Sequence, residues 1–408
     1  MKTAKRIFLC MLALLLPLCG GCMDWTALLP GSSTKAPADP DKYRDEFSSR
    51  WCYSRLNGRL RTCYGTIYTA LNDGFDREDI IHTQDPETPT PGITVLLPES
   101  IDRQEAQTLY TAVLYDTPAF FHVRNTYFLS GQTDGGVDTY QSLSFEYTMT
   151  ASERLTARQQ LHAAVQQATQ GLPATEDQYI RELHLYNWLL EHCDYDAAAA
   201  GEGVADHPQA YTAYGALVDG RAVCEGYARG LQLLLTESGI EGVPVTGYGR
   251  EERSGHMWNL VRINGAEYYL DATFDDAGDT PRHSFFNTTT QQILLDRTID
   301  DSLFWGEACT ATADNYYVRE GTYIDTYQRR VIAAVMAARL RQGDTVVELQ
   351  FAPDKYANGL LFLKNTTLTL QMLNPLLADT GRQIKSYRLF SVKEQGTLTF
   401  QPEYYAVS

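Results

Sequence analysis

The sequence predicts an α+β protein, and three observations lead to this class. Apolar residues between Cys224 and Gly239 recur with the spacing of a helix. The dipeptide Asn264-Gly265 stands between two apolar runs, where it favours a two-residue turn that joins antiparallel strands. On either side of this region, helical and strand patterns follow one another. A chain of 408 residues is also longer than one hydrophobic core usually grows, so several domains are expected.

The first of these domains is predicted to be an α+β region over residues 43–175. Residues 102–115 have helical spacing and an acidic start, while 120–129 and 140–149 have the composition of strands. Between the two strands, the Gly-rich run S-G-Q-T-D-G-G predicts a turn.

A central domain over residues 176–310 and a C-terminal α+β region over 311–408 are predicted to follow. The central domain begins with a helix over 178–196, after which the run A-A-A-A-G-E-G predicts a flexible segment. The C-terminal region is expected to contain a helix and two strands, at 327–341, 345–351 and 398–405.

The N-terminus has the order of residues of an export signal. Three basic residues precede an apolar stretch that is too short to cross a membrane, and this stretch ends in L-C-G-G-C. The small residues before Cys22 resemble the lipobox of bacterial lipoproteins, in which the cysteine is acylated. We therefore expect a lipoprotein signal peptide at 1–21, lipid attachment at Cys22, a flexible tether at 22–42 and an extracytoplasmic, membrane-anchored protein. A secretory signal with an incidental cysteine is the alternative.

The charge of the chain limits its partners. Without the signal peptide there are 31 basic and 51 acidic residues, a net charge of −20. Such a chain repels polyanions, which argues against nucleic acid, while polypeptides stay open as partners. After Cys22 the sequence has no C-x-x-C and no H-E-x-x-H motif, so it predicts no metal and no other cofactor.

Five cysteines follow Cys22, and an odd number in an exported protein indicates at least one free thiol. Cys224 is the natural one to stay unpaired. If Cys52 and Cys63 lay on one continuous helix, they would be about three turns apart and unable to bridge. A disulfide between them stays open, but free buried thiols are favoured for Cys52, Cys63, Cys193 and Cys309.

A thiol, an imidazole and a carboxylate follow one another along the chain as Cys224, His256 and Asp271. Each alone is more often structural: a cysteine is usually a small buried hydrophobe, and an aspartate near a strand end is commonly a cap. Together they have the order of a nucleophile, a base and an orienting group. The expected helix start at Cys224 strengthens this interpretation, because its positive end favours a thiolate and its N–H groups could receive an oxyanion.

The turn at Asn264-Gly265 predicts how the imidazole and the carboxylate are placed. A two-residue turn pairs the residues that flank it, and this register puts Asp271 opposite Trp258 and Thr273 opposite His256. His256 and Asp271 are then diagonal neighbours that point the same way. The opposite face would be apolar, with Met257, Val261 and Ile263 beside Tyr268, Leu270 and Ala272.

The segment from Ala213 to Asp276 resembles the core of the transglutaminase-like superfamily, in the branch found on bacterial extracellular proteins. The matching runs are A-Y-G-A-L-V-D-G-R-A-V-C-E-G-Y-A, G-I-E-G-V-P-V-T-G, G-H-M-W-N and Y-Y-L-D-A-T-F-D-D. The resemblance implies a papain-like fold in which the nucleophile helix packs on an antiparallel sheet. Met257 and Phe274 depart from the residues that are frequent there, and both departures affect packing more than chemistry.

Carried over to this sequence, the resemblance implies that Cys224 is the nucleophile, His256 the general base and acid, and Asp271 the group that orients His256. Tyr214 is a weak candidate for the oxyanion partner. We expect acyl transfer on peptide or glutamine amide bonds of a protein or peptide, cell-wall peptides included, with hydrolysis favoured. The alternatives are a crosslinking or deamidating transglutaminase, a non-catalytic surface binding module, and a peptidoglycan endopeptidase of the wider papain-related clan.

Overall fold

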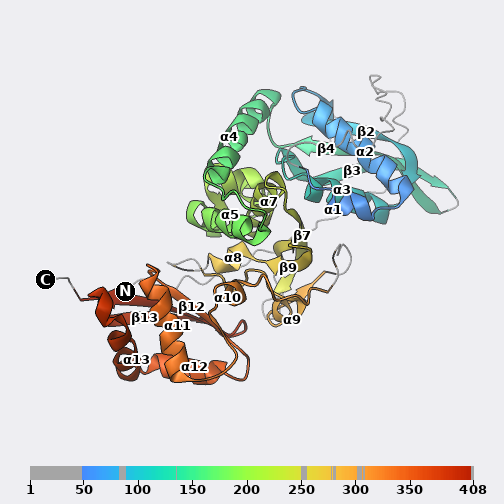
Figure 1. Ribbon diagram of the computed structural model, residues 1–408. Coiled ribbons are helices and arrows are strands. Elements are labelled where there is room, and N and C mark those ends of the chain that lie inside the picture. Colours follow the sequence, from blue (N-terminus) through green and yellow to red (C-terminus); the bar gives the residue numbers. More distant parts are fainter. Residues whose placement is uncertain are drawn as a thin grey trace. The chain divides into compact units, whose positions relative to one another are not determined.

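The computed structural model describes residues 48–81, 89–134, 136–249, 255–276, 278, 282–300, 306 and 308–405. The predicted signal peptide, Cys22 and the tether lie outside these residues. Helices and mainly antiparallel sheets make up the described chain (Figure 1), which confirms the predicted α+β class. The chain falls into two compact units, Met1–Arg262 with Thr298–Glu307, and Ile263–Arg297 with Ala308–Ser408.

The first unit begins with a four-stranded sheet in the order β1-β2-β4-β3 and three helices. The strands are β1 Ile80–Ile81, β2 Thr90–Ile101, β3 Val123–Asp134 and β4 Val137–Tyr147, and the helices are α1 Trp51–Arg55, α2 Gly58–Asp73 and α3 Arg103–Asp116. The acidic start predicted for α3 is confirmed as a capping box formed by Asp102 and Glu105.

The predicted Gly-rich turn in this sheet is mostly strand. β3 and β4 pair antiparallel as far as Asp134 and Val137, so the run S-G-Q-T-D belongs to β3. Gly131 shows why a glycine occurs there: a Cβ at this position would overlap the backbone of Thr139 and Tyr140 on β4. The glycine therefore permits a close approach of two strands rather than a turn.

Helices make up most of the rest of the first unit. They are α4 Ala151–Thr169, α5 Gln178–His192, α6 Ala197–Glu202 and α7 Cys224–Glu237, with the short turns η2 Pro208–Tyr211 and η3 Gly215–Asp219 and the paired strands β5 Asp194–Tyr195 and β6 Arg221–Ala222. The run A-A-A-A-G-E-G, predicted to be flexible, forms α6. Alanine is the best helix former, and Asp196 caps the helix by accepting from the N–H groups of Ala198 and Ala199.

The helix α7 is buried on all sides, which places it in the core of its unit. Leu231, Leu233, Leu234 and Leu235 are fully buried although they point in different directions around the helix. α7 packs against α5, η2 and the strand β7, Glu241–Gly249. β7 pairs antiparallel with β8, Gly255–Ile263, and the register places Gly247 opposite His256.

The second unit begins at the predicted turn. Asn264 and Gly265 both have positive φ, 49° and 87°, as a type I′ turn requires, so the two-residue turn is confirmed. Strand β9, Ala266–Leu270, follows it, and the chain then enters the short helix α8, Ala272–Asp275. The predicted strand positions of Ala272 and Thr273 are therefore wrong, because Asp271 ends the strand and caps α8.

The rest of the second unit is a C-terminal sheet with its helices. The strand order is β11-β12-β14-β13, with β11 parallel to β12 and the other pairs antiparallel. The strands are β11 Tyr323–Ile324, β12 Val347–Phe351, β13 Ile384–Val392 and β14 Thr397–Tyr404. The helices are α9 Thr290–Ile293, α10 Tyr316–Arg319, α11 Arg329–Arg341, α12 Tyr356–Lys364, α13 Thr366–Leu373 and η5 Asn374–Thr380, and strand β10, Arg297–Ile299, crosses the boundary between the units. The predicted C-terminal helix and both strands are thus confirmed.

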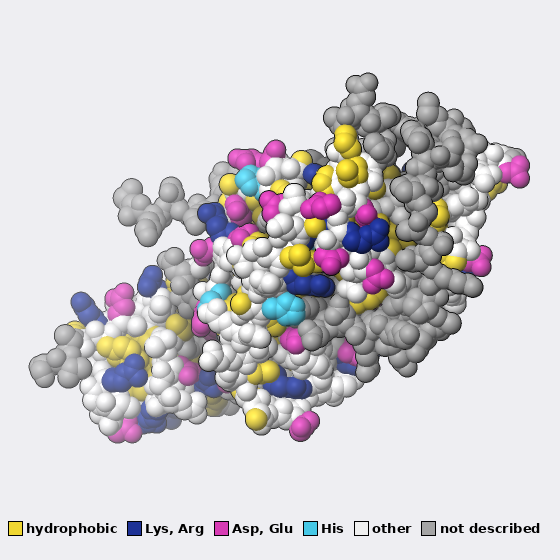
Figure 2. Space-filling view, turned by 90° about the horizontal axis from the view of Figure 1, so that it is seen from above, with side chains coloured by type: hydrophobic (Ala, Val, Ile, Leu, Met, Phe, Trp, Pro, Cys, Tyr) yellow, Lys and Arg dark blue, Asp and Glu magenta, His cyan; other side chains and the backbone are white. Residues whose placement is uncertain are grey.

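The described surface carries charges of both signs. On the face in Figure 2, Lys and Arg side chains lie among Asp and Glu side chains. Among the described residues, no helix combines the length and the apolar character needed to cross a membrane.

Candidate active site

Cys224 is the first residue of α7, as predicted. Its thiol is partly exposed, whereas the other four cysteines of the described chain are buried, and these five residues form no disulfide with one another. Val223, which precedes the helix, provides no side-chain cap. The N–H groups of the first turn therefore keep the capacity to bind an acceptor that approaches the helix end.

A glycine lets another segment approach the first turn of α7 closely. A Cβ on Gly226 would lie 2.5 Å from the Ala210 carbonyl oxygen and 2.7 Å from the Ala222 Cβ. The backbone N–H of Val223 also donates to the Ala210 carbonyl oxygen, at 2.9 Å. The start of α7 is thus fixed against η2 by backbone contacts.

Further along, polar side chains of α7 anchor it to its neighbours. The Tyr227 hydroxyl donates to the Cys193 carbonyl oxygen at 2.8 Å, and Gln232 Nε2 donates to the Gly242 carbonyl oxygen at 3.3 Å. Arg229 and Glu225 form a buried ion pair one turn apart, with Nη2 2.8 Å from Oε1. The Tyr227 and Gln232 bonds hold the helix of Cys224 to the end of α5 and to β7, while the ion pair lies within α7 itself.

His256 is the second residue of β8 and is 4% exposed. Its ring stacks on Trp258, two residues along the strand, with ring centroids 5.7 Å apart. The next residue, Asn259, donates from Nδ2 to the Ala228 carbonyl oxygen of α7 at 2.9 Å. The sequence predicts an apolar face and a polar face for this strand, but residues on both faces of β8 are buried. The strand of His256 is hydrogen-bonded to the helix of Cys224.

Asp271 lies in the second unit, between β9 and α8, and is 1% exposed. Its Oδ1 accepts from the Phe274 N–H at 3.2 Å, and its Oδ2 forms an ion pair with Arg297 Nη1. Arg297 is equally buried, and its guanidinium packs against the rings of Phe274 and Phe285, 4.4 and 4.6 Å from their centroids. Sequence reasoning missed Arg297, because no motif surrounds it and 26 residues separate it from Asp271.

The structure thus places the three predicted residues on defined elements. Cys224 and His256 lie on two elements of the first unit that share a hydrogen bond, and Asp271 lies with Arg297 in the second unit. The assembly of all three into one triad stays a prediction.

Tyr214, the weak candidate for the oxyanion partner, directly precedes η3. Its hydroxyl donates to Gln160 Oε1 at 2.7 Å, and its ring stacks on Phe121 with centroids 5.3 Å apart. A hydroxyl proton committed to Gln160 would have to leave that partner before it could bind an oxyanion.

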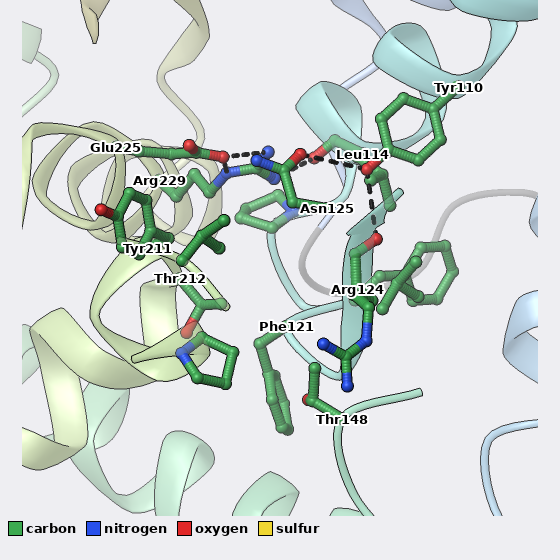
Figure 3. A pocket seen from close by; sticks show the side chains of 15 residues that line it. Tyr110, Leu114, Phe121, Arg124, Asn125, Thr148, Tyr211, Thr212, Glu225 and Arg229 are labelled. Atoms are coloured by element: carbon green, nitrogen blue, oxygen red, sulfur yellow. Dashed lines mark hydrogen bonds and ion pairs between the residues drawn. The ribbon is translucent and has the colours of Figure 1, made fainter. Parts of the chain in front are cut away.

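A pocket lies against the first turns of α7 (Figure 3), and its space amounts to about 430 Å³ when the adjoining open solvent is counted. Glu225 and Arg229 form one wall, Tyr211 and Thr212 another, and Phe121 lies across from them. Glu225 uses Oε1 for Arg229, while its buried Oε2 has no hydrogen-bond partner among the described residues. The pocket is therefore a mixed aromatic and polar space beside the helix of Cys224. Within the described chain, His, Cys, Asp and Glu side chains form no group of three that could bind a metal ion.

Comparison with solved structures gives three similar proteins. They are a TGase (12% identical; 52% of this chain and 59% of that chain covered; TM-score 0.28), a proposed cysteine protease from Cytophaga hutchinsonii (14%; 37% and 66%; 0.24) and a proposed protease from Parabacteroides distasonis ATCC 8503 (11%; 40% and 37%; 0.21). The chain therefore covers less than two thirds of the length of each. No curated protein matches the chain.

The sequence model of the transglutaminase-like superfamily matches residues 163–271. This segment runs from α4 to the end of β9 and contains Cys224, His256 and Asp271. The superfamily includes cysteine proteases and transglutaminases. Over residues 163–271, the chain is therefore similar to the transglutaminase-like superfamily.

Proposed function

We propose that this chain is a cysteine enzyme that hydrolyses peptide or glutamine amide bonds through a thioester on Cys224. One observation carries the proposal: within the superfamily segment, a free thiol at the start of a buried helix is accessible, while the other cysteines of the described chain are buried. A nucleophile has to reach its substrate, and of these five thiols Cys224 has the exposure to do so.

The proposed reaction has two halves. Cys224 Sγ attacks the amide carbonyl carbon while His256 accepts the thiol proton, and the C–N bond breaks as His256 returns this proton to the leaving amine. Water then gives a proton to His256 and attacks the thioester, the C–S bond breaks to release the acid, and His256 returns the proton to Cys224 Sγ. Asp271 orients His256, and the N–H groups of the first turn of α7 receive the oxyanion.

Crosslinking and deamidation use the same first half. With a glutamine side chain as substrate, ammonia leaves, and either water or a lysine amine resolves the thioester. Which group attacks the thioester, water or a lysine amine, distinguishes these reactions, and the triad is the same in both.

The deciding experiment incubates the signal-free protein and Cys224→Ala with casein, peptidoglycan fragments and a primary amine donor, and identifies products by mass spectrometry. Cleavage by the wild type alone supports hydrolysis, and incorporation of the amine by the wild type alone selects transamidation. Identical product spectra from both proteins would reject catalysis and leave a binding module with this fold.

We further propose that the enzyme is a lipoprotein, located outside the cytoplasm and anchored to the cell membrane through Cys22. The order of basic residues, apolar stretch and L-C-G-G-C supports this. The full chain and Cys22→Ser would be expressed in a bacterial host and fractionated. We expect the wild type in the membrane fraction with an acylated Cys22. The variant is expected in the soluble fraction. Equal fractionation of the two proteins would contradict it.

A further inference from the structure

Arg297 connects Asp271 to a second carboxylate. Its Nη1 pairs with Asp271, while its Nε and Nη2 lie 3.0 and 3.4 Å from the two oxygens of Asp296. Asp296 is about one fifth exposed, whereas Asp271 and Arg297 are almost fully buried. One guanidinium therefore serves two carboxylates at the edge of the core, and the three groups together carry one net negative charge.

The surroundings of the guanidinium keep it in place. Phe274 and Phe285 lie against it, and Phe285 is itself fixed because its N–H donates to both oxygens of Asp275, at 3.1 and 3.2 Å. A planar guanidinium stacks on aromatic rings and binds carboxylates at its edge, which a lysine ammonium cannot do in the same way. The position demands arginine by its shape as well as by its charge.

The Asp271 carboxylate is held at both oxygens. Oδ1 accepts from the Phe274 N–H and Oδ2 is bound by Arg297. An ionised carboxylate held in one orientation is what an orienting partner for an imidazole needs.

We propose that Arg297 is a positioning residue of this site: it holds Asp271 ionised and oriented, and its charge sets how strongly Asp271 stabilises the imidazolium form of His256. This rests on the proposed function, because it takes Asp271 as the partner of His256. Arg297 does not touch the reacting atoms and acts through Asp271.

Counting charges gives the sign of each effect. With Arg297 present, the cluster of Asp271, Arg297 and Asp296 carries −1. Arg297→Gln makes the net charge of the cluster −2, which favours the imidazolium and raises the pKa of His256. Asp296→Asn makes the cluster neutral, which lowers the pKa of His256. Arg297→Lys keeps the charge and should leave the pKa close to its wild-type value.

The experiment titrates the imidazole directly, by NMR of the full chain with labelled histidine, and His256→Gln identifies the signal. We expect the pKa of His256 to rise by about one unit or more in Arg297→Gln and to fall in Asp296→Asn. The control is Arg154→Gln, which removes another fully buried guanidinium, one that donates to the carbonyl oxygens of Phe75, Met149 and Arg77. It should reduce stability without moving the pKa of His256.

Equal titration of His256 in the wild type, Arg297→Gln and Asp296→Asn would overturn the proposal and leave Arg297 a purely structural residue. If Arg297→Gln does not fold, the direction in which the pKa of His256 moves in Asp296→Asn decides. This variant is expected to fold because Asp296 is partly exposed at the edge of the core. Failure of the proposed function is seen separately, as activity retained by Cys224→Ala, and the titration needs no activity.

Discussion

Asn259 Nδ2 donates a hydrogen bond of 2.9 Å to the Ala228 carbonyl oxygen, and this bond joins the strand of His256 to the helix of Cys224. Both residues are buried, at 1% and 2% exposure. The two residues are 31 positions apart in the chain and belong to the elements that carry the first two members of the candidate triad, so their bond helps to fix the separation of thiol and imidazole.

Asn259→Ala is therefore expected to reduce both stability and activity. The Ala228 carbonyl lies inside α7 and keeps its helical donor, so loss of this one bond costs about 0.5–1.5 kcal/mol. Urea unfolding and kcat/KM would measure the two effects. The matched control is Gln350→Ala in β12, which removes a buried bond of the same kind, from Nε2 to the Gln395 carbonyl oxygen at 3.1 Å. If both variants lost the same stability and kept full activity, Asn259 would have no part in placing the site.

Selective alkylation tests the accessibility of Cys224. Burial raises the pKa of the Cys52 and Cys63 thiols and raises that of Cys309 to about 12, so these groups are both hidden and protonated near neutral pH. Iodoacetamide at pH 7.5 should modify Cys224 at least about tenfold faster than the buried cysteines. Peptide mapping by mass spectrometry gives the sites, and Cys224→Ser should take up label only on unfolding. Earlier labelling of any buried cysteine would refute the assignment.

Asp271→Asn tests the orienting role. Loss of the anion is expected to reduce kcat/KM by about 10² to 10⁴-fold, as in other triads that lose their carboxylate. Because Arg297 loses a buried partner, the free energy of unfolding should also fall by about 3 kcal/mol. Glu320→Gln is the control: it breaks the pair with Arg339 at 2.6 Å, outside the superfamily segment, and should leave activity intact. Full activity in Asp271→Asn would remove Asp271 from the mechanism.

His122 should make the protein less stable in acid. Its ring is fully buried among Phe75, Phe121 and Tyr147, and burial, followed by Arg154 and Arg158, holds its pKa well below the ordinary 6.5. Below pH 6.5, His122 of the unfolded chain binds a proton that it does not bind in the native state. The contribution of the neutral ring to the free energy of unfolding is therefore complete above pH 6.5 and is lost as the pH falls. Between pH 6.5 and 5 the loss is about 1–2 kcal/mol.

His122→Phe should remove that loss, measured by urea unfolding at several pH values. Burial raises the pKa of Asp116 to about 6, so this residue has the opposite effect. Its contribution to the free energy of unfolding is lost as the pH rises from about 4 to 6. The comparison is therefore between the wild type and His122→Phe at each pH. The exposed His192 provides the control variant, His192→Gln. A pH dependence unchanged by His122→Phe would contradict the prediction.

The parts of the fold that sequence predicts well are those that short-range chemistry specifies. The helix that begins at Cys224 is predicted by its apolar spacing and by Gly239, which follows the helix and has a φ of 73°. The turn at Asn264-Gly265 follows from two residues that tolerate positive φ. Both features need only their immediate neighbours in the chain.

The failures have specific physical causes. The alanine-rich α6 was expected to be flexible because its two glycines outweighed the cap at Asp196 and the helix propensity of alanine. β9 ends at Leu270 because Asp271 caps α8, a competition between strand and cap that alternation does not reveal. Arg297 became visible only through its long-range ion pair.

Gly226 has a consequence for how substitutions at this site would be interpreted. Since a Cβ there would lie 2.5 Å from the Ala210 carbonyl oxygen, a saturation library should tolerate replacements at 226 as poorly as at Cys224 itself. A mutational profile alone would then rank two residues two positions apart as equally essential, although one is proposed to form a bond with substrate and the other only leaves room for a neighbouring backbone.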